Sequence, residues 1–285
     1  MLARRVVRRS FNAVARLSSG LGRRAAAIAE ELNVPTVSHP ENVQFKDLHL
    51  GRRAFVIGNG PSLAGQDISA LKGELLFTMN SFDRHPLCRE LRPLYHSLAD
   101  PAENSNDVPE EANLAKIADG IGESPVFIPA WPSIDSAVLQ KWRSAGQLWT
   151  VPMYGSLADG PVRVFDMCVG FPGVQSTSQL AIMAAVYMGC NPIYLIGLDT
   201  DWAASSNLDR HFYGEPTLDE TWDSTEYDEH WSYQRILEST LALFKGYTNL
   251  REYCRSRNVE VYNCTAGGLL DVFPRKRFED VIADG

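Results

Sequence analysis

Short apolar runs, each ending at a glycine or a polar residue, recur along the chain from residue 53 onward. Runs of this kind are typical of strands that are buried on both faces of a parallel sheet. The pattern predicts strands at residues 53–57, 75–79, 93–98, 125–129, 192–198 and 259–262.

Helical patterns lie between these runs. They predict an exposed helix at 107–122, a buried helix at 177–189 and a long helix at 231–257. The buried helix starts with hydroxyl residues and ends at a glycine, as capping requires. Residues 203–230 are polar and aromatic without a period, which predicts a functional loop or lid. The alternation of strands and helices predicts an α/β fold: a single Rossmann-like domain with a doubly wound, mainly parallel sheet.

The first 24 residues hold seven arginines and no acidic residue. On a helical wheel, the large apolar residues from Leu2 to Leu21 fall in one half, and every arginine except Arg24 falls in the other. This pattern predicts an amphipathic helix that contacts an anionic membrane surface through residues 2–24. A solvated leader and an organellar transit peptide are the alternatives.

These patterns divide the chain into three expected parts. A basic amphipathic helix is expected within residues 1–32, and the nucleotide-binding catalytic domain within 52–285, with its lid near 203–230. Residues 33–51 contain Pro35 and Pro40 and lack strong periodicity. They are therefore interpreted as a linker.

Composition excludes several classes of protein. Hydrophobic residues make up 45% and charged residues 22% of the chain, which is ordinary for a globular protein. No apolar run is long enough for a membrane-spanning helix, and no C-x-x-C pair suggests a zinc site.

Beyond residue 24 the chain carries 20 basic and 35 acidic residues, a net charge of −15. An acidic body binds nucleic acid poorly, because that affinity comes mostly from neutralising phosphates. No nucleic-acid partner is expected.

Five of the predicted strands end in polar or glycine-rich segments, and ligands of such sheets bind at the carboxyl ends of the strands. The segments are Gly58–Ser62, Asn80–Ser81, His96–Asp100, Asp199–Asp201 and Asn263–Gly268. Because all five segments are polar or glycine-rich, the sequence predicts a ligand site at this edge of the sheet. From them we select Gly58, Asn59, Gly60, Ser62, Asn80, His96 and Gly268 as candidate nucleotide contacts.

The turn at Gly58 and Gly60 allows the backbone to approach a ligand, and the helix expected after it would direct N–H groups at a phosphate. Leu63 occupies the place of the third glycine of G-x-G-x-x-G, so an ordinary dinucleotide site is not expected. Ser176 and Thr177 begin another helix, where hydroxyl groups and free amides can hold an anion.

Two further groups carry candidate chemistry. Asp199-Thr200-Asp201 resembles the D-x-D pattern that holds a divalent metal and nucleotide phosphates in many glycosyltransferases. The sequence does not require a cofactor. If Asp199 and Asp201 hold a metal ion, we expect Mg²⁺ or Mn²⁺. His211 and Glu215 in the long loop are candidate proton acceptors.

Three blocks of the sequence together resemble a known family. They are Ile57-Gly58-Asn59-Gly60-Pro61-Ser62-Leu63, Asn80 after a strand, and Ser176-Thr177-Ser178 leading to the strand 193–198 and Asp199. They are similar to the bacterial sialyltransferases of lipooligosaccharide synthesis. The same blocks resemble the domain shared by flagellin-modifying Maf glycosyltransferases and archaeal 6-hydroxymethylpterin diphosphokinases. The similarity covers roughly residues 52–275.

The sialyltransferase resemblance implies a single domain with a lid, a CMP-sugar donor and inversion at the anomeric carbon. It also implies nucleotide contacts from Asn59, Gly60, Asn80 and Thr177. The chain departs from the family at two positions. Asp201 stands where the family has a tyrosine that holds the leaving phosphate, and Glu215 stands where it has its general-base histidine. A carboxylate beside a leaving phosphate repels it unless a metal intervenes.

The sequence therefore predicts an inverting glycosyltransferase that uses a nucleotide-activated sugar, CMP-linked and acidic, and a glycan acceptor. Surface glycan, lipopolysaccharide or flagellin glycosylation is the expected process, at the inner face of the bacterial cytoplasmic membrane. His211, Glu215 and Asp201 are the expected catalytic residues. An ATP-dependent diphosphotransferase and a non-catalytic, membrane-associated nucleotide-binding protein are the alternatives, and a homo-oligomer is left open.

Overall fold

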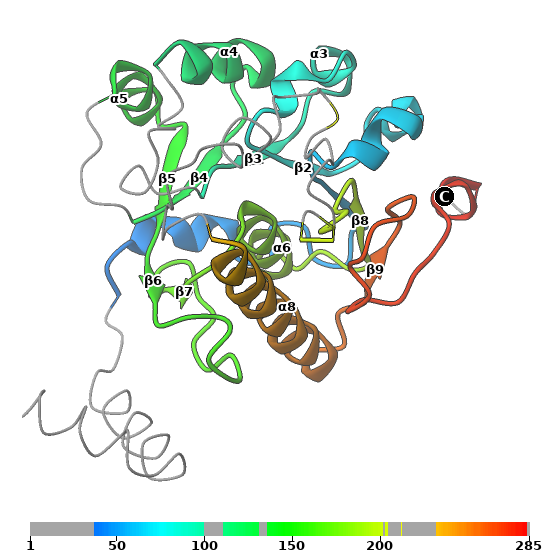
Figure 1. The fold of residues 1–285 in the computed structure, drawn as a ribbon. Coiled ribbons are helices and arrows are strands. Elements are labelled where there is room, and N and C mark those ends of the chain that lie inside the picture. Colours follow the sequence, from blue (N-terminus) through cyan, green and yellow to red (C-terminus); the bar gives the residue numbers. More distant parts are fainter. Residues whose placement is uncertain are drawn as a thin grey trace, which may run out of the picture. The chain divides into compact units, whose positions relative to one another are not determined.

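A seven-stranded, wholly parallel sheet forms the centre of the fold in the computed structural model (Figure 1). The structure describes residues 37–99, 111–130, 136–201, 203–204, 212 and 232–283. Residues from Ser38 onward belong to one compact unit. The expected amphipathic helix and most of the expected lid lie outside the described residues, so both stay predictions.

The sheet has the strand order β5-β4-β3-β2-β1-β8-β9. Its strands are β1 (Ala54–Ile57), β2 (Leu76–Met79), β3 (Tyr95–Ser97), β4 (Val126–Pro129), β5 (Leu148–Val151), β8 (Ile193–Ile196) and β9 (Val261–Asn263). A separate two-stranded sheet pairs β6 (Met153–Tyr154) with β7 (Phe171–Pro172). The six strands predicted from apolar runs are confirmed. Strand β5 was not predicted, because it lies at the edge of the sheet and three of its four residues are only partly buried.

Helices flank the sheet. They are α3 (Cys88–Leu91), α4 (Glu111–Ile121), α5 (Ala137–Ser144), α6 (Thr177–Tyr187), α8 (Tyr233–Ser256) and α9 (Phe278–Ala283). The described residues also form the 3₁₀ helices η1 (Pro40–Phe45), η2 (Pro61–Gly65), η3 (Ser69–Leu71) and η4 (Phe82–Arg84). Helix α4 was predicted to be exposed, but Leu114, Ile117 and Ile121 are buried. Their spacing places them on one stripe of the helix, which packs on the sheet side.

The sheet is wound on both faces, as predicted. Alternate residues of each strand point to opposite faces, so neighbours in sequence enter different clusters. Val56 belongs to the cluster that includes α6 and α8, whereas Phe55 and Ile57 belong to the cluster that includes η2, η3 and α9. The chain runs outward from β1 to β5, crosses over through α6, and returns to β8 on the other side of β1 (Figure 1). The strand order therefore reverses between β1 and β8, and this is the switch point of the sheet.

The expected linker at 33–51 is corrected by the structure from Ser38 onward. Phe45 is buried, with its ring edge-to-face on the rings of Phe127 and Trp149 at centroid distances of 5.1 and 4.9 Å. The side-chain amide of Asn42 donates to the carbonyl oxygens of Thr150 and Met167 at 2.9 and 2.8 Å. This segment is part of the domain. A single aromatic anchor has no periodicity, so the sequence pattern did not reveal it.

Among the helices that the structure describes, none is both long enough and apolar enough to cross a membrane.

Replacing Phe45 by alanine should lower the free energy of unfolding by about 3–5 kcal/mol, because it opens a cavity beside the rings of Phe127 and Trp149. Val43 lies in the same turn with 59% of its surface exposed. The Val43→Ala control should therefore change the stability by less than about 0.5 kcal/mol. Urea unfolding of both variants measures the difference. Equal, small effects of the two substitutions would mean that residues 38–51 are a loosely attached linker after all.

Candidate functional site

Two loops that follow the central strands approach each other closely at the switch point. The backbone N–H of Gly58 donates to Ile196 O and that of Gly60 donates to Gly197 O, both at 2.8 Å. A Cβ atom on Gly58 would lie 2.5 Å from Leu198 Cδ2, and one on Gly60 would lie 2.7 Å from Asp199 Cγ. Both distances are too short for real atoms. The two glycines are therefore needed for contact between the loops, independently of any ligand.

Asp199 connects three loops of the site. Its carboxylate accepts hydrogen bonds from the backbone N–H of Ser62 at 3.2 Å and from the Ser62 hydroxyl at 2.8 Å. Its carbonyl oxygen accepts from the N–H of Leu269 at 2.7 Å. Gly268 packs so tightly that a Cβ there would lie 2.6 Å from Asp199 Cα. The loops after β1, β8 and β9 are thus held together at Asp199.

The Asp199 carboxyl group is held in an unusual electrostatic environment. Only 5% of the residue is exposed. Burial raises its pKa above the ordinary value, the hydrogen bonds from Ser62 act in the opposite direction, and the nearby charge of Asp201 raises the pKa further. The side chain is therefore a weaker acid than a surface aspartate.

A second junction connects the loop after β2 with the start of α6. Asn80 has a left-handed backbone (φ 47°), and its N–H donates to Ser97 O at 3.1 Å. The hydroxyl of Thr177 donates to Asn80 Oδ1 at 3.0 Å. The side-chain amide of Asn59 donates to Met79 O at 3.0 Å, whereas the buried Asn59 Oδ1 has no partner within the described part of the chain. Asn59 therefore retains a buried acceptor between these two loops.

Hydroxyl groups connect the start of α6 with the long helix α8. Ser176 caps α6 by accepting from the N–H of Ser178 at 3.3 Å. The hydroxyl oxygens of Ser176 and Ser178 lie 2.8 Å apart, and Ser178 Oγ lies 2.5 Å from Tyr247 Oη. Burial raises the pKa of Tyr247 to about 12, so the phenol is neutral. Tyr247 was not predicted from the sequence, because a single aromatic residue within a helical pattern is typical of a core position.

The loops enclose a cavity of about 240 Å³ at the carboxyl ends of the strands, which we call the switch-point cavity. It is lined by Gly58, Asn59, Gly60, Met79, Asn80, Ser176, Ser178, Gly197, Leu198, Asp199, Thr200, Asp201 and Tyr247. Three strand ends and one helix start contribute to this lining. The partial positive charge at the N-terminus of α6 favours an anionic ligand here, and so do the polar side chains of the lining. The carboxylates of Asp199 and Asp201 act against such a ligand.

Most of the residues predicted for the site meet at this cavity. Ser62 and Thr177 are hydrogen-bonded to residues that line it, and Gly268 lies directly behind Asp199. His211 and Glu215 lie outside the described residues. Phe212, which follows His211, donates its backbone N–H to Asn59 O at 2.9 Å. The long loop therefore contacts the β1 loop at this point.

His96 is not part of the cavity wall. Its side chain is fully buried in the sheet, with Nδ1 2.9 Å from the hydroxyl of Thr78 on the neighbouring strand. Burial lowers its pKa to about 3, so the imidazole is neutral. The prediction placed it at a strand end, but the register puts it inside β3, opposite Thr78. Its Nε2 is buried without a hydrogen-bond partner in the described part of the chain.

A metal site receives limited support from the geometry. Within the residues that the structure describes, no three or more histidine, cysteine, aspartate or glutamate side chains are grouped so as to hold a metal ion. Both carboxylate oxygens of Asp199 already accept hydrogen bonds from Ser62. Asp199 therefore fits the role of a connector between loops better than that of a metal ligand.

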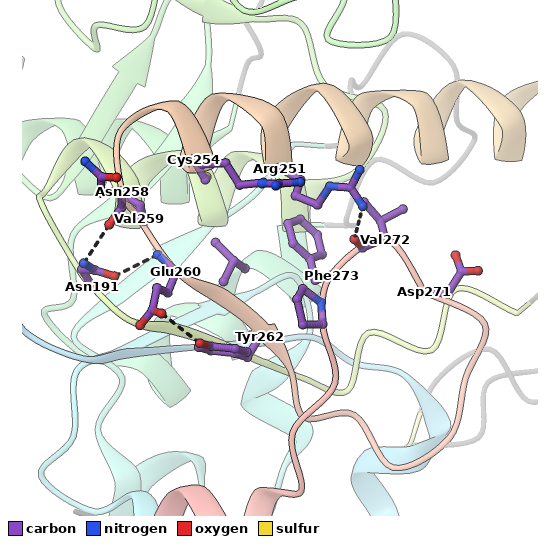
Figure 2. A pocket seen from close by; sticks show the side chains of 13 residues that line it. Asn191, Arg251, Cys254, Asn258, Val259, Glu260, Tyr262, Asp271, Val272 and Phe273 are labelled. Carbon is purple, nitrogen blue, oxygen red and sulfur yellow. Dashed lines mark hydrogen bonds between the residues drawn. The ribbon is translucent and has the colours of Figure 1, made fainter.

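A larger cavity of about 840 Å³ lies elsewhere, between the C-terminal half of α8 and the edge strand β9 (Figure 2). Figure 2 shows Asn191 joining Asn258 and Glu260 on one side, and Arg251 bonded to Val272 O on the other. Asn191 and Glu260 precede β8 and β9, so this cavity reaches the amino ends of these strands. Ligands of doubly wound sheets bind at the opposite end.

Comparisons with known proteins give matches among solved structures only. No family model matches the chain, and no curated protein sequence matches it. The chain is similar to the sialyltransferase CstII from Campylobacter jejuni in complex with cytidine-5'-monophosphate, with 14% identity and a TM-score of 0.43 over 79% of this chain and 85% of that one. The complex of CstII with the substrate analogue CMP-3FNeuAc gives 13% identity and a TM-score of 0.40 over the same shares. The complex of CST-II with a trisaccharide acceptor and CMP gives 13% and 0.41 over 78% of this chain and 85% of that one.

Proposed function

We propose that this protein is an inverting glycosyltransferase that transfers an acidic sugar from a CMP-linked donor to a glycan acceptor. One observation carries the proposal. Asn59, Gly60, Asn80 and Thr177, the positions for which the sequence resemblance implies nucleotide contacts, come from three separate segments and gather at the switch-point cavity. Surface glycan, lipopolysaccharide or flagellin glycosylation is the process in which such an enzyme acts.

The proposed reaction needs a site that stabilises a leaving phosphate. The acceptor hydroxyl attacks the anomeric carbon while the bond from that carbon to the phosphate oxygen breaks, and the nucleotide monophosphate leaves with the electron pair. The N-terminus of α6, with Ser176 and Thr177, would stabilise the charge that develops on this phosphate. The buried Asn59 Oδ1 would accept a hydrogen bond from the nucleotide.

A base must remove the proton of the acceptor hydroxyl, and we assign this role to His211 or Glu215. The contact between Phe212 N–H and Asn59 O supports this assignment, because it fixes the residue next to His211 at the donor loop. A general base typically contributes about 10²–10⁴ in rate. Turnover by His211→Ala and Glu215→Ala proteins tests the assignment, which is wrong if both retain more than about a tenth of the parent rate.

The proposed function is tested by thermal shifts with CMP, CDP, UDP, GDP and ATP, each with and without Mg²⁺. CMP at a hundred times its Kd should stabilise the protein by about 2.7 kcal/mol. Asn59→Ala should reduce the shift strongly. Gly60→Ala should do the same, because the added Cβ displaces Asp199. The matched control is Gly65→Ala, since a Cβ at Gly65 has nothing within 4 Å.

The other outcomes of this experiment assign the alternatives. A shift with ATP and Mg²⁺ alone would indicate the diphosphotransferase. A CMP shift without transfer to any acceptor would indicate a nucleotide-binding protein without catalysis. Equal CMP shifts in the Gly60→Ala, Asn59→Ala and Gly65→Ala proteins would place the nucleotide away from this cavity and contradict the proposal.

Asp199→Asn should preserve the fold and bind CMP at least as tightly as the parent. The amide can keep both contacts with Ser62, accepting from its N–H and donating to its hydroxyl oxygen, while the charge is removed. In the parent, affinity for CMP should fall as pH rises through the elevated pKa of Asp199, because the ionised carboxylate repels phosphate. The variant should lack this component of the pH dependence.

Calorimetric titration of both proteins with CMP across the pH range, with EDTA or with Mn²⁺, measures these effects. If affinity in the parent depends on Mn²⁺ and the Asn variant loses it, Asp199 is a metal ligand, together with Asp201, and its role as a connector is secondary.

A further inference from the structure

A third cavity, of about 320 Å³, lies at the carboxyl end of β9, on the side of η2. Three consecutive cationic residues, Arg275, Lys276 and Arg277, line it, and Glu279 is the only acidic residue among the described residues of its lining. We call it the Arg275 pocket. Its walls are completed by Gln66, Phe278 and the segment Asn263–Ala266.

The side chain of Arg275 shapes this pocket. Its guanidinium donates to the carbonyl oxygens of Thr265, Gly267 and Gly268 at 3.1, 2.6 and 2.9 Å. Gln66 fixes the same loop, because its amide donates to Cys264 O at 2.9 Å and accepts from the N–H of Ala266 at 3.2 Å. Hydrogen bonds from Arg275 and Gln66 therefore hold the backbone of the loop that forms this pocket.

The positive charge in this pocket is largely uncompensated. In the described part of the chain, no carboxylate lies within ion-pair distance of Arg275 or Lys276, and Arg277 is 3.6 Å from Glu279 at the exposed rim. Lys276 Nζ lies 3.7 Å from the centre of the Tyr262 ring. The larger cavity beside α8 differs, since both of its arginines, Arg251 and Arg255, form ion pairs with Glu252. Glu260 and Asp271 add two acidic residues to its lining. A net positive pocket on an acidic body selects an anion.

The loop after β9 connects the Arg275 pocket with the switch-point cavity. The loop after β9 bonds to Asp199 O through Leu269 N–H, while the carbonyl oxygens of Gly267 and Gly268 face Arg275. Strands β8 and β9 are neighbours in the sheet, so both sites open at the same end of adjacent strands. A second substrate bound here would lie at the same end of the sheet as the first.

We propose that the Arg275 pocket binds the phosphate group of a phosphorylated sugar acceptor. The pocket can hold a group of that size, and a phosphate carries about −1.5 to −2 charge at neutral pH, which matches the pocket's excess of cations. Charge-assisted hydrogen bonds from Lys276 and Arg277 would hold its oxygens. The assignment of the ligand as the acceptor rests on the proposed function, whereas the binding of a sugar phosphate does not.

The test is a titration with glucose 6-phosphate, followed by amide NMR signals at fixed ionic strength, with glucose as the uncharged control. Lys276→Glu and Arg277→Glu should each weaken binding about tenfold or more, as loss of a charge-assisted contact does. Arg255→Glu makes the same change of charge in the larger cavity and should alter Kd less than twofold. Ser176→Glu, which adds a carboxylate at the switch-point cavity, should also leave Kd unchanged. Lys276→Gln repeats the test with a milder change, and a cooperative melting transition confirms that each variant is folded.

Three results would overturn the proposal: no binding to the parent, equal weakening by Arg255→Glu, or loss of binding in Ser176→Glu alone. The last result would place the phosphate in the switch-point cavity. Failure of the protein to bind CMP would contradict the proposed function but leave these titrations unchanged, so the two failures are distinguishable.

Discussion

The close approach of the loops after β1 and β8 is the constraint on which the rest of the site depends. It leaves no room for a Cβ atom at Gly58 or Gly60, and it brings the carboxylate of Asp199 onto Ser62. The strands that carry these loops are paired at four successive positions, from Ala54 with Ile193 to Ile57 with Ile196. The rigid pairing of buried strands therefore fixes the positions of the two loops.

This constraint has an electrostatic consequence. A buried carboxylate is costly unless it is hydrogen-bonded, and Ser62 provides two of the necessary donors. The elevated pKa of Asp199 shows that these bonds do not fully offset burial and the charge of Asp201. A phosphate bound nearby would meet this group, so the protonation of Asp199 connects the stability of the site with its affinity for an anion. The start of α6 supplies the opposing partial positive charge.

The parallel α/β fold could be predicted from the sequence because buried strands are continuous apolar runs. Strand β5 and the Phe45 anchor could not, since each depends on contacts that leave no periodic trace. For the site, the rule that ligands bind at carboxyl ends of strands correctly grouped Asn59, Asn80 and Asp199. The same rule failed for His96, because a shift of one or two residues in strand length decides whether a side chain reaches the rim of the sheet or stays in the core.

Gly58 and Gly60 were selected because they would let a ligand approach the backbone, whereas the structure explains them by the contact between two loops. Tyr247 and the Arg275 pocket depend on tertiary packing of α8 and of the last loop, which no local pattern encodes.

The proposed function rests on the binding of a nucleotide phosphate at the reversal of strand order between β1 and β8. A crystal structure of the protein with CMP would locate this phosphate. It should lie against the start of α6, with the nucleotide within reach of Asn59 and Asn80. Electron density for CMP in the larger cavity between α8 and β9, or an empty switch-point cavity at saturating CMP, would contradict this prediction.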